Sequence, residues 1–330
     1  MEKELSQIKD LIESKYSFVN DITESIHNVI VGQDNLIKKL IIAILTDGHV
    51  FLEGVPGLAK TLTIKTLAQL INTDFQRIQF TPDLLPADII GTLIFNPKKS
   101  DFEIKKGPIF SNIILADEIN RSPAKVQSAL LEAMQERQIT IGDKTFSLDN
   151  PFLVMATQNP IEQEGTYPLP EAQVDRFMFK INLDYPNFNE ELEILKKMDK
   201  IESKINIKPI ISIDQIIEAR KVVDQIYISD NIYEYIVSLV MSTRKPEEYN
   251  LKDLNTLITY GASPRATIFL SRAAKSNAFL NKREFVIPED VRSVGKSILR
   301  HRIILSYEAE ADEITTDDII LRLFESIPTP

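Results

Sequence analysis

The sequence contains no cysteine and only three histidines among its 330 residues. Without cysteine there is no disulfide framework, no thiolate metal site and no cysteine nucleophile. The histidines, His27, His49 and His301, lie far apart in the sequence, which disfavours a histidine-rich metal site. Thiol chemistry is therefore excluded, and a site built on clustered imidazoles is not expected.

Long hydrophobic runs and a targeting pattern are also absent. No apolar run approaches the roughly 18 residues that a membrane-spanning helix needs, and residues 1–5 lack the basic-then-apolar start of a signal peptide. Hydrophobic residues make up 43% of the chain and charged residues 26%, which is ordinary for a soluble globular protein. We expect a cytoplasmic protein of one or two domains.

Positive charge is in short supply, because the formal net charge is −10. An acidic balance disfavours a broad nucleic-acid-binding face. The pairs Lys98-Lys99 and Lys105-Lys106 could still contribute to a local basic surface. No internal repeat and no low-complexity segment occur.

A phosphate-binding loop is predicted between an apolar run at 49–52 and a helix-forming run at 62–70. Backbone N–H groups and the dipole at a helix N-terminus attract anions. Lys60 would reach the outer phosphates of a nucleotide, and the Thr61 hydroxyl would bind Mg²⁺. The residues predicted to contact the nucleotide here are Gly54, Val55, Pro56, Gly57, Leu58, Ala59, Lys60, Thr61 and Leu62.

Ala59 departs from the usual pattern, which has glycine immediately before the lysine. Only glycine visits positive φ freely. An alanine is therefore expected to fit only if the backbone keeps a negative φ. An ordinary strand-to-helix turn that carries a surface lysine is the alternative interpretation.

Two acidic residues follow the apolar run 113–116, which is typical of a buried strand. In open α/β sheets, ligands bind at the carboxyl ends of the strands. Asp117 would hold Mg²⁺ directly or through water, and Glu118 would polarise the attacking water. Simple turn residues are the alternative, but the upstream phosphate loop favours the functional interpretation.

Three further residues are candidates for a nucleotide site. Asn159 follows the apolar run 152–157 and would hydrogen-bond the attacking water or the γ-phosphate, or else cap the next turn. Arg176 is expected on an exposed helical turn, as a surface ion pair or as an arginine finger. Ser263-Pro264 begins a helix, which directs Arg265 outward from its first turn.

The composition changes near residues 183–187. Strand and helix patterns alternate before it, with hairpins predicted at 92–104 and 138–148. We therefore predict an α/β nucleotide-binding core with an N-terminal helical segment at 1–186 and a helical domain at 187–330. Amphipathic helices are predicted in the second part at 190–198, 214–226, 232–243, 264–280, 288–300 and 316–324.

In this order the segments resemble a MoxR-type AAA+ ATPase, a P-loop NTPase of the helix-2-insert type, over about residues 20 to 325. In that family alanine is usual before the P-loop lysine. The matching motifs are Gly54-Val55-Pro56-Gly57-Leu58-Ala59-Lys60-Thr61, Thr81-Pro82-Asp83-Leu84-Leu85-Pro86, Leu115-Ala116-Asp117-Glu118-Ile119-Asn120-Arg121, Ala156-Thr157-Gln158-Asn159-Pro160 and the run 169–177.

The resemblance implies a fold and a set of roles. The fold is an AAA+ P-loop core with a central parallel sheet, followed by an all-α lid domain. The hairpins correspond to the helix-2 insert and the pre-sensor-1 insert. The implied roles are Walker A for Lys60 and Thr61, Walker B for Asp117 and Glu118, sensor 1 for Asn159, arginine finger for Arg176, sensor 2 for Arg265, and adenine contact for Val31 and Gly32.

The resemblance also implies ATP and Mg²⁺ as ligands and a hexameric ring with ATP between subunits. Partners with von Willebrand factor A domains and chaperone-like remodelling are common in the family. A nucleotide-gated scaffold with little turnover is a second hypothesis, but a pure binder needs neither Glu118 nor Arg176. A nucleic-acid-stimulated motor is a third, which the acidic balance disfavours.

Overall fold

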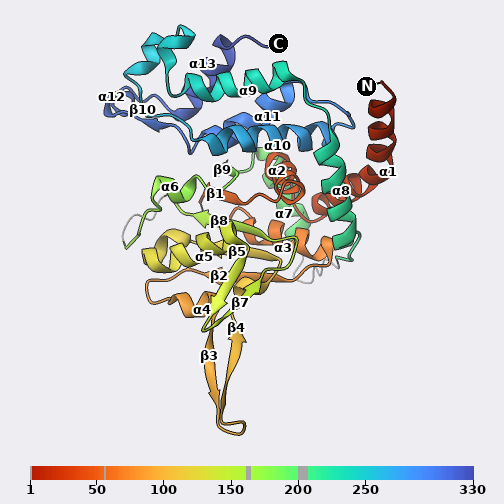
Figure 1. Cartoon of the computed structure of the whole chain (residues 1–330), viewed down its shortest axis with the longest axis vertical. Coiled ribbons are helices and arrows are strands. Elements are labelled where there is room, and N and C mark those ends of the chain that lie inside the picture. The colour runs from red at the N-terminus through yellow and green to blue at the C-terminus, as the bar shows by residue number, and fades with distance from the viewer. Residues whose placement is uncertain (1, 56, 161–164, 200–206) are drawn as a thin grey trace. The chain divides into compact units, whose positions relative to one another are not determined.

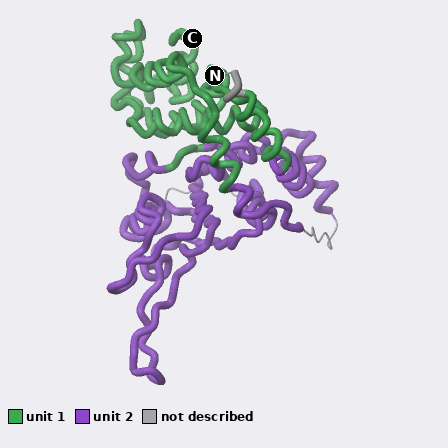
Figure 2. The backbone as a smooth tube through the Cα atoms, turned by 45° about the vertical axis from the view of Figure 1, so that its right-hand side comes forward, with its two compact units in different colours: residues 1–17, 177–180, 217–330 green, residues 18–176, 181–216 purple. Residues whose placement is uncertain are grey.

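The computed structural model describes residues 2–55, 57–160, 165–199 and 207–330. The chain forms two compact units (Figure 2). The first, called here the sheet unit, comprises residues 18–176 and 181–216. The second, the helical unit, comprises residues 1–17, 177–180 and 217–330.

A five-stranded sheet organises the fold, with the strand order β2-β5-β8-β1-β9. The pairs β2–β5, β5–β8 and β8–β1 are parallel, so their carboxyl ends share one edge. The apolar strands β5 and β8 are almost completely buried, as expected for a parallel sheet covered on both faces. The predicted α/β fold with a central parallel sheet is confirmed. The strand bounds are β1 (Val50–Gly54), β2 (Phe75–Gln79), β5 (Ile113–Asp117), β8 (Leu153–Gln158) and β9 (Phe179–Leu183).

β9 was not predicted from the sequence. Its residues alternate between apolar Phe179, Ile181 and Leu183 and polar Lys180 and Asn182, which is the period of a strand. The composition changes directly after β9. We interpreted this change as a domain boundary and predicted no strand before it.

Helices and two antiparallel hairpins accompany the sheet in Figure 1. Both predicted hairpins are confirmed, and β3–β4 extends away from the parallel sheet. The helices are α2 (Asp34–Leu45), α3 (Lys60–Ile71), α4 (Pro86–Ile90), α5 (Ala124–Glu136), α6 (Glu171–Val174) and α7 (Phe188–Met198), with short 3₁₀ turns η1 (Pro108–Phe110) and η2 (Ile119–Arg121). The hairpin strands are β3 (Gly91–Asn96), β4 (Asp101–Lys106), β6 (Gln138–Ile141) and β7 (Lys144–Ser147).

The helical unit contains the amphipathic helices predicted after residue 213, together with a short antiparallel pair that was not predicted. Two helices, α1 (Glu2–His27) and α8 (Ile213–Gln225), contribute residues to both units. The other elements are α9 (Asp230–Ser242), α10 (Pro264–Leu280), α11 (Pro288–Leu299), α12 (Tyr307–Ala311), α13 (Thr316–Ser326), β10 (Ile258–Tyr260), β11 (Ile304–Leu305), η3 (Pro246–Tyr249) and η4 (Lys252–Asn255).

The compact units divide the chain differently from the predicted boundary at residue 186. Residues 187–216 group with the sheet unit, where the backbone N–H groups of Ile210 and Ile211 donate to the Leu70 carbonyl. Residues 177–180 group with the helical unit, where the Arg302 guanidinium donates to the Phe177 carbonyl at 2.7 Å. The boundaries of the two units depend on contacts between residues far apart in the sequence, which amino-acid composition cannot predict.

Among the helices in the described ranges, none has the length and apolar character that crossing a lipid bilayer requires.

His49 is a buried, neutral element of the sheet unit. Its Nδ1 accepts a hydrogen bond from the Val154 N–H at 3.0 Å, so the Nε2–H faces the Met134 carbonyl at 3.3 Å. Burial, together with the charge of Arg137, lowers the pKa of His49 well below its usual value. The imidazole therefore serves as a hydrogen-bonding core residue.

Acidification should destabilise the fold through His49. Below a pH of about 6.5 the unfolded chain takes up a proton that the folded protein excludes, so the free energy of unfolding falls as the pH falls. Between pH 7 and pH 5.5, we expect the free energy of unfolding of His49→Gln to fall by roughly 1 kcal/mol less than that of wild type. Urea unfolding at both pH values measures this difference. Equal losses in the two proteins would contradict the assignment.

Candidate nucleotide-binding site

The loop between β1 and α3 is closed by its own lysine. The Lys60 Nζ donates to the carbonyl of Gly54 at 2.6 Å, joining the end of β1 to the first residue of α3. A side chain at position 54 would be crowded, because its Cβ would lie 2.9 Å from the Cβ of Leu183. Val55 begins the loop, and Pro56 lies outside the described residues, so its predicted contact stays a prediction.

A cavity of about 420 Å³ lies at the carboxyl edge of the sheet, beside the start of α3. Parallel pairing brings the ends of β5 and β8 to that edge. The structure thus gathers the predicted phosphate-loop residues, both acids and the predicted sensor asparagine around one space, called here the phosphate pocket. Its lining consists of Gly57, Leu58, Ala59, Lys60, Thr61, Leu62, Arg77, Asp117, Glu118, Thr157 and Asn159.

The Thr157 hydroxyl joins the two acids. It donates to Oδ1 of Asp117 at 2.6 Å and accepts from the backbone N–H of Glu118 at 2.9 Å. Glu118 has a φ of +55°, a left-handed conformation that non-glycine residues adopt at a cost. The hydrogen bond to Thr157 therefore helps to hold the Glu118 backbone in this turn and the Asp117 carboxylate beside it.

Residues of β2 and η2 provide hydrogen-bond donors for both carboxylates. Arg77 donates to Oδ2 of Asp117 through Nε at 3.0 Å and Nη2 at 2.6 Å. Oε2 of Glu118 accepts from Gln79 Nε2 at 2.9 Å and from Arg121 Nη1 at 3.1 Å. These hydrogen bonds hold both carboxylates at the mouth of the pocket.

Sequence reasoning missed Arg77, Gln79 and Thr157. Arg77 and Gln79 are two residues apart and so lie on one face of β2, and Gln79 is directly opposite Asp117 in the register. The alternation of residues along β2 is visible in the sequence, but the pairing of β2 with β5 is not.

Lys60 lines the same pocket as the two acids. Burial lowers the pKa of its amine, and the charges of Asp117 and Glu118 act in the opposite direction. An anionic phosphate would act in the same direction as these carboxylates and favour the protonated lysine.

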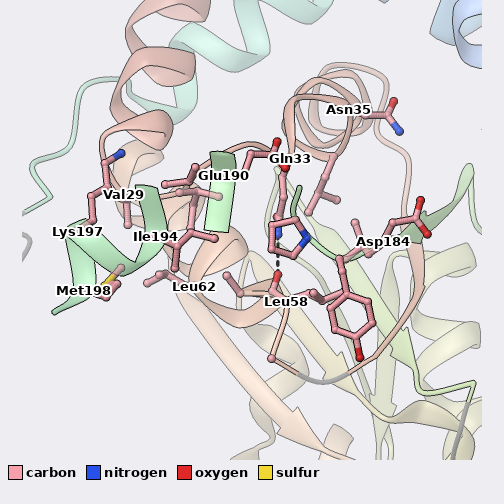
Figure 3. Close-up of a pocket in the computed structure, with 18 of the residues that line it drawn as sticks. Val29, Gln33, Asn35, Leu58, Leu62, Asp184, Glu190, Ile194, Lys197 and Met198 are labelled. Atoms are coloured by element: carbon pink, nitrogen blue, oxygen red, sulfur yellow. Dashed lines mark hydrogen bonds between the residues drawn. The ribbon is translucent and has the colours of Figure 1, made fainter. Parts of the chain in front are cut away.

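Figure 3 shows a second pocket, of about 300 Å³. Gly57, Leu58, Ala59 and Leu62 line both, so the two spaces meet across the loop. We call it the base pocket. Its walls include Val29, Ile30, Val31, Leu36, Leu183, Tyr185, Pro186, Ile194 and Met198, with Gln33, Asn35, Asn182, Asp184, Glu190 and Lys197 as polar members.

The segment before α2 is attached to the phosphate loop. Gln33 Nε2 donates to the Leu58 carbonyl at 2.7 Å, the dashed line in Figure 3. Val31, predicted from the resemblance to contact adenine, lines the base pocket. Gly32 stands next to it with a φ of +66°, and a Cβ there would lie 2.4 Å from Oε1 of Glu190. The positive φ and the nearby Glu190 side chain both favour glycine at this position.

Two predicted site residues lie elsewhere. Arg176 was expected on an exposed turn, but it is half-buried against α5, where Nη1 donates to the Leu131 carbonyl at 2.8 Å. It is not part of the described lining of its own chain's phosphate pocket. Arg265 lies in the first turn of α10, as predicted, and belongs to the helical unit.

The residues present fit a magnesium nucleotide. Thr61 and Asp117 offer hard oxygen ligands in one pocket. Within the described ranges no three His, Cys, Asp or Glu side chains gather to hold a metal. Mg²⁺ needs no such cluster when phosphate oxygens and water complete its shell.

Ala59 contradicts one expectation. Its φ is +53°, not the negative value that an alanine was expected to require. The left-handed conformation costs an alanine about 1 kcal/mol, a cost that glycine avoids. The loop geometry therefore overrides the preference of the residue.

Substituting glycine should relieve this strain. We expect Ala59→Gly to raise the free energy of unfolding by up to about 1 kcal/mol, after the greater freedom of glycine in the unfolded chain is subtracted. The matched control is Ala68→Gly in the same helix α3, where glycine should instead destabilise by about 1 kcal/mol or more. Chemical denaturation measures both. Destabilisation of similar size in the two variants would show that Ala59 is unstrained.

Two segments of the chain match known protein families. Residues 49–179 match the ATPase family associated with various cellular activities (AAA), and residues 252–323 match the AAA lid domain. Chaperone MoxR1 of Mycobacterium tuberculosis is 48% identical over 92% of this chain and 80% of its own length. Protein MoxR of Methylorubrum extorquens is 28% identical, covering 92% and 93%. A solved structure of a proposed ATPase from Cytophaga hutchinsonii superposes with a TM-score of 0.93 at 52% identity, covering 99% of each chain.

Proposed function

Because the chain belongs to the MoxR family of AAA+ ATPases, we propose that it hydrolyses ATP to drive chaperone-like remodelling or maturation of a partner protein. The observation that carries the proposal is the phosphate pocket. A lysine and a threonine at a helix start face an aspartate and a glutamate at the end of a parallel strand, and the base pocket adjoins them.

Each part of the nucleotide has residues suited to it. The base occupies the base pocket with Val31 and Gly32 beside it, and the phosphates lie at the N-terminus of α3. Lys60 offers its ammonium to the outer phosphates. Thr61 and Asp117 hold Mg²⁺, which when bound neutralises charge on the phosphate oxygens. Both oxygens of Asp117 already accept protein hydrogen bonds, which favours binding through water.

Glu118 and Asn159 have the catalytic roles. The Glu118 carboxylate accepts the proton of the attacking water, and the Asn159 amide orients that water or the γ-phosphate. Thr157 is a positioning residue, because its hydroxyl joins Asp117 to the backbone of Glu118.

Arg176 acts on the site of a neighbouring subunit. Its place against α5, outside the described lining of its own phosphate pocket, supports this role. A hexameric ring with ATP between subunits would place Arg176 beside the nucleotide of the next subunit. Arg265 then serves as sensor 2 from the lid, and a von Willebrand factor A domain protein is the proposed partner.

Removing the carboxylate of Glu118 separates hydrolysis from binding. We expect Glu118→Gln to lower kcat for phosphate release by roughly 10²-fold or more while ATP binding persists, because only the proton acceptor is lost. Glu248→Gln, at an exposed glutamate of the helical unit that pairs with Lys245, is the matched control and should keep wild-type turnover. Equal rates in wild type and Glu118→Gln would favour the nucleotide-gated scaffold.

Mixing defective subunits tests the shared site. Arg176→Ala and Lys60→Ala subunits should each be inactive alone, and mixed rings should regain part of the activity, since an intact Lys60 site can meet an intact Arg176. Phosphate release across mixing ratios measures the recovery. If mixed rings form and stay inactive at every ratio, Arg176 does not act between subunits.

A further inference from the structure

Strand β2 contributes one of the described residues that line the phosphate pocket, Arg77. In the sheet register Arg77 is directly opposite Leu115 of β5. Leu115 and Asp117 are two residues apart and so lie on the same face of β5. A long side chain on β2 therefore reaches the Asp117 carboxylate from the neighbouring strand.

The Arg77 guanidinium is held by hydrogen bonds to two side chains. Its Nε and Nη2 both donate to Oδ2 of Asp117, at 3.0 Å and 2.6 Å. Nη2 also donates to Oε1 of Gln79 at 2.7 Å. The side chain of Asp117 is only 16% exposed, whereas that of Arg77 is 50% exposed. A half-exposed cation thus compensates the charge of a largely buried carboxylate.

Asp117 has little hydrogen-bonding capacity left. A carboxylate offers about four lone-pair positions to donors. Arg77 uses two of them on Oδ2, and the Thr157 hydroxyl uses one on Oδ1. Roughly one position remains, which is enough for one water molecule of a hydrated metal ion.

We propose that Arg77 is a resident counter-cation of Asp117, which lets the site bind a nucleotide before Mg²⁺ and lowers the affinity of the site for the metal. Arg77 is a positioning residue, because it acts through Asp117. This inference rests on the proposed function, since it requires the phosphates to lie in the phosphate pocket.

Electrostatics gives the reason for both effects. An uncompensated Asp117 would repel the phosphates of a metal-free nucleotide across the pocket, and Arg77 removes that repulsion. The same positive charge repels Mg²⁺ and occupies Oδ2, so the metal binds less tightly. Because coupling between two ligands is reciprocal, Mg²⁺ then strengthens nucleotide binding by a smaller factor than it would without Arg77.

The neighbouring cations are placed differently. Lys60 donates to the main chain at the end of β1 at 2.6 Å, and Arg121 pairs with Glu118 at 3.1 Å, outside the described lining of the pocket. A half-exposed ion pair contributes little to the stability of a fold. The ion pair of Arg77 therefore has its main consequence for ligand binding and not for the free energy of unfolding.

The test varies the charge at position 77 and measures binding with and without metal. Arg77→Gln removes the charge, and Arg77→Lys keeps it. Arg322→Gln is the matched control, because it removes an exposed arginine that pairs with Asp253 in the helical unit at 3.3 Å. Fluorescence anisotropy gives the dissociation constant of a fluorescent, non-hydrolysable ATP analogue in excess EDTA and in excess MgCl₂. Thermal unfolding checks that each variant folds.

We expect Arg77→Gln to bind the analogue roughly fivefold or more weakly than wild type in EDTA, with a much smaller change in MgCl₂. Calorimetric titration of the protein–analogue complex with Mg²⁺ should reach half-saturation at a lower concentration in Arg77→Gln than in wild type. Arg77→Lys should lose less affinity in EDTA than Arg77→Gln, and Arg322→Gln should match wild type.

A purely structural role for Arg77 would weaken binding equally in both buffers, and that result would overturn the proposal. So would equal losses in Arg77→Lys and Arg77→Gln, or a wild type that binds the analogue only with Mg²⁺. No binding to wild type in either buffer would remove the proposed function as well. Hydrolysis is not needed for any of these measurements, so a failure of the ATPase proposal would be seen separately.

Discussion

The parallel pairing of β1, β8 and β5 is the constraint on which the site depends. Parallel strands end at one edge, so Lys60 after β1, Asp117 at the end of β5 and Asn159 after β8 meet around one pocket although the first and the last are 99 positions apart in the sequence. A slip of one residue in the β5 register would turn Asp117 to the opposite face of the sheet. The buried apolar side chains of β5 and β8 oppose such a slip.

Two of the ten described non-glycine residues with a positive φ lie beside this pocket. Ala59 and Glu118 both have positive φ, one at the start of α3 and the other at the end of β5. Local hydrogen bonds hold them there, from Lys60 to Gly54 and from Glu118 to Thr157. Such outliers persist where the surrounding structure over-determines them, and they cluster at functional sites. The fold thus keeps two unfavourable residue conformations at the place where the nucleotide is proposed to bind.

Sequence reasoning found the residues whose signal is local. The phosphate loop and the acids after β5 are visible because glycine, lysine and carboxylates stand at the ends of apolar runs. Contacts between strands could not be predicted, because the order of strands in the sheet brings Arg77 and Thr157 to Asp117. The φ of Ala59 was predicted with the wrong sign, since residue preference was weighed without the loop that imposes the geometry. The prediction that Val31 and Gly32 contact adenine came from the family resemblance alone.

The most direct test of the account is the position of the metal. A crystal grown with Mn²⁺ in place of Mg²⁺ and a non-hydrolysable ATP analogue would reveal the ion by its anomalous scattering. The account predicts a single strong peak between the Thr61 hydroxyl and the Asp117 carboxylate, beside phosphates that lie at the start of α3. Nucleotide bound with its metal away from both side chains would contradict it.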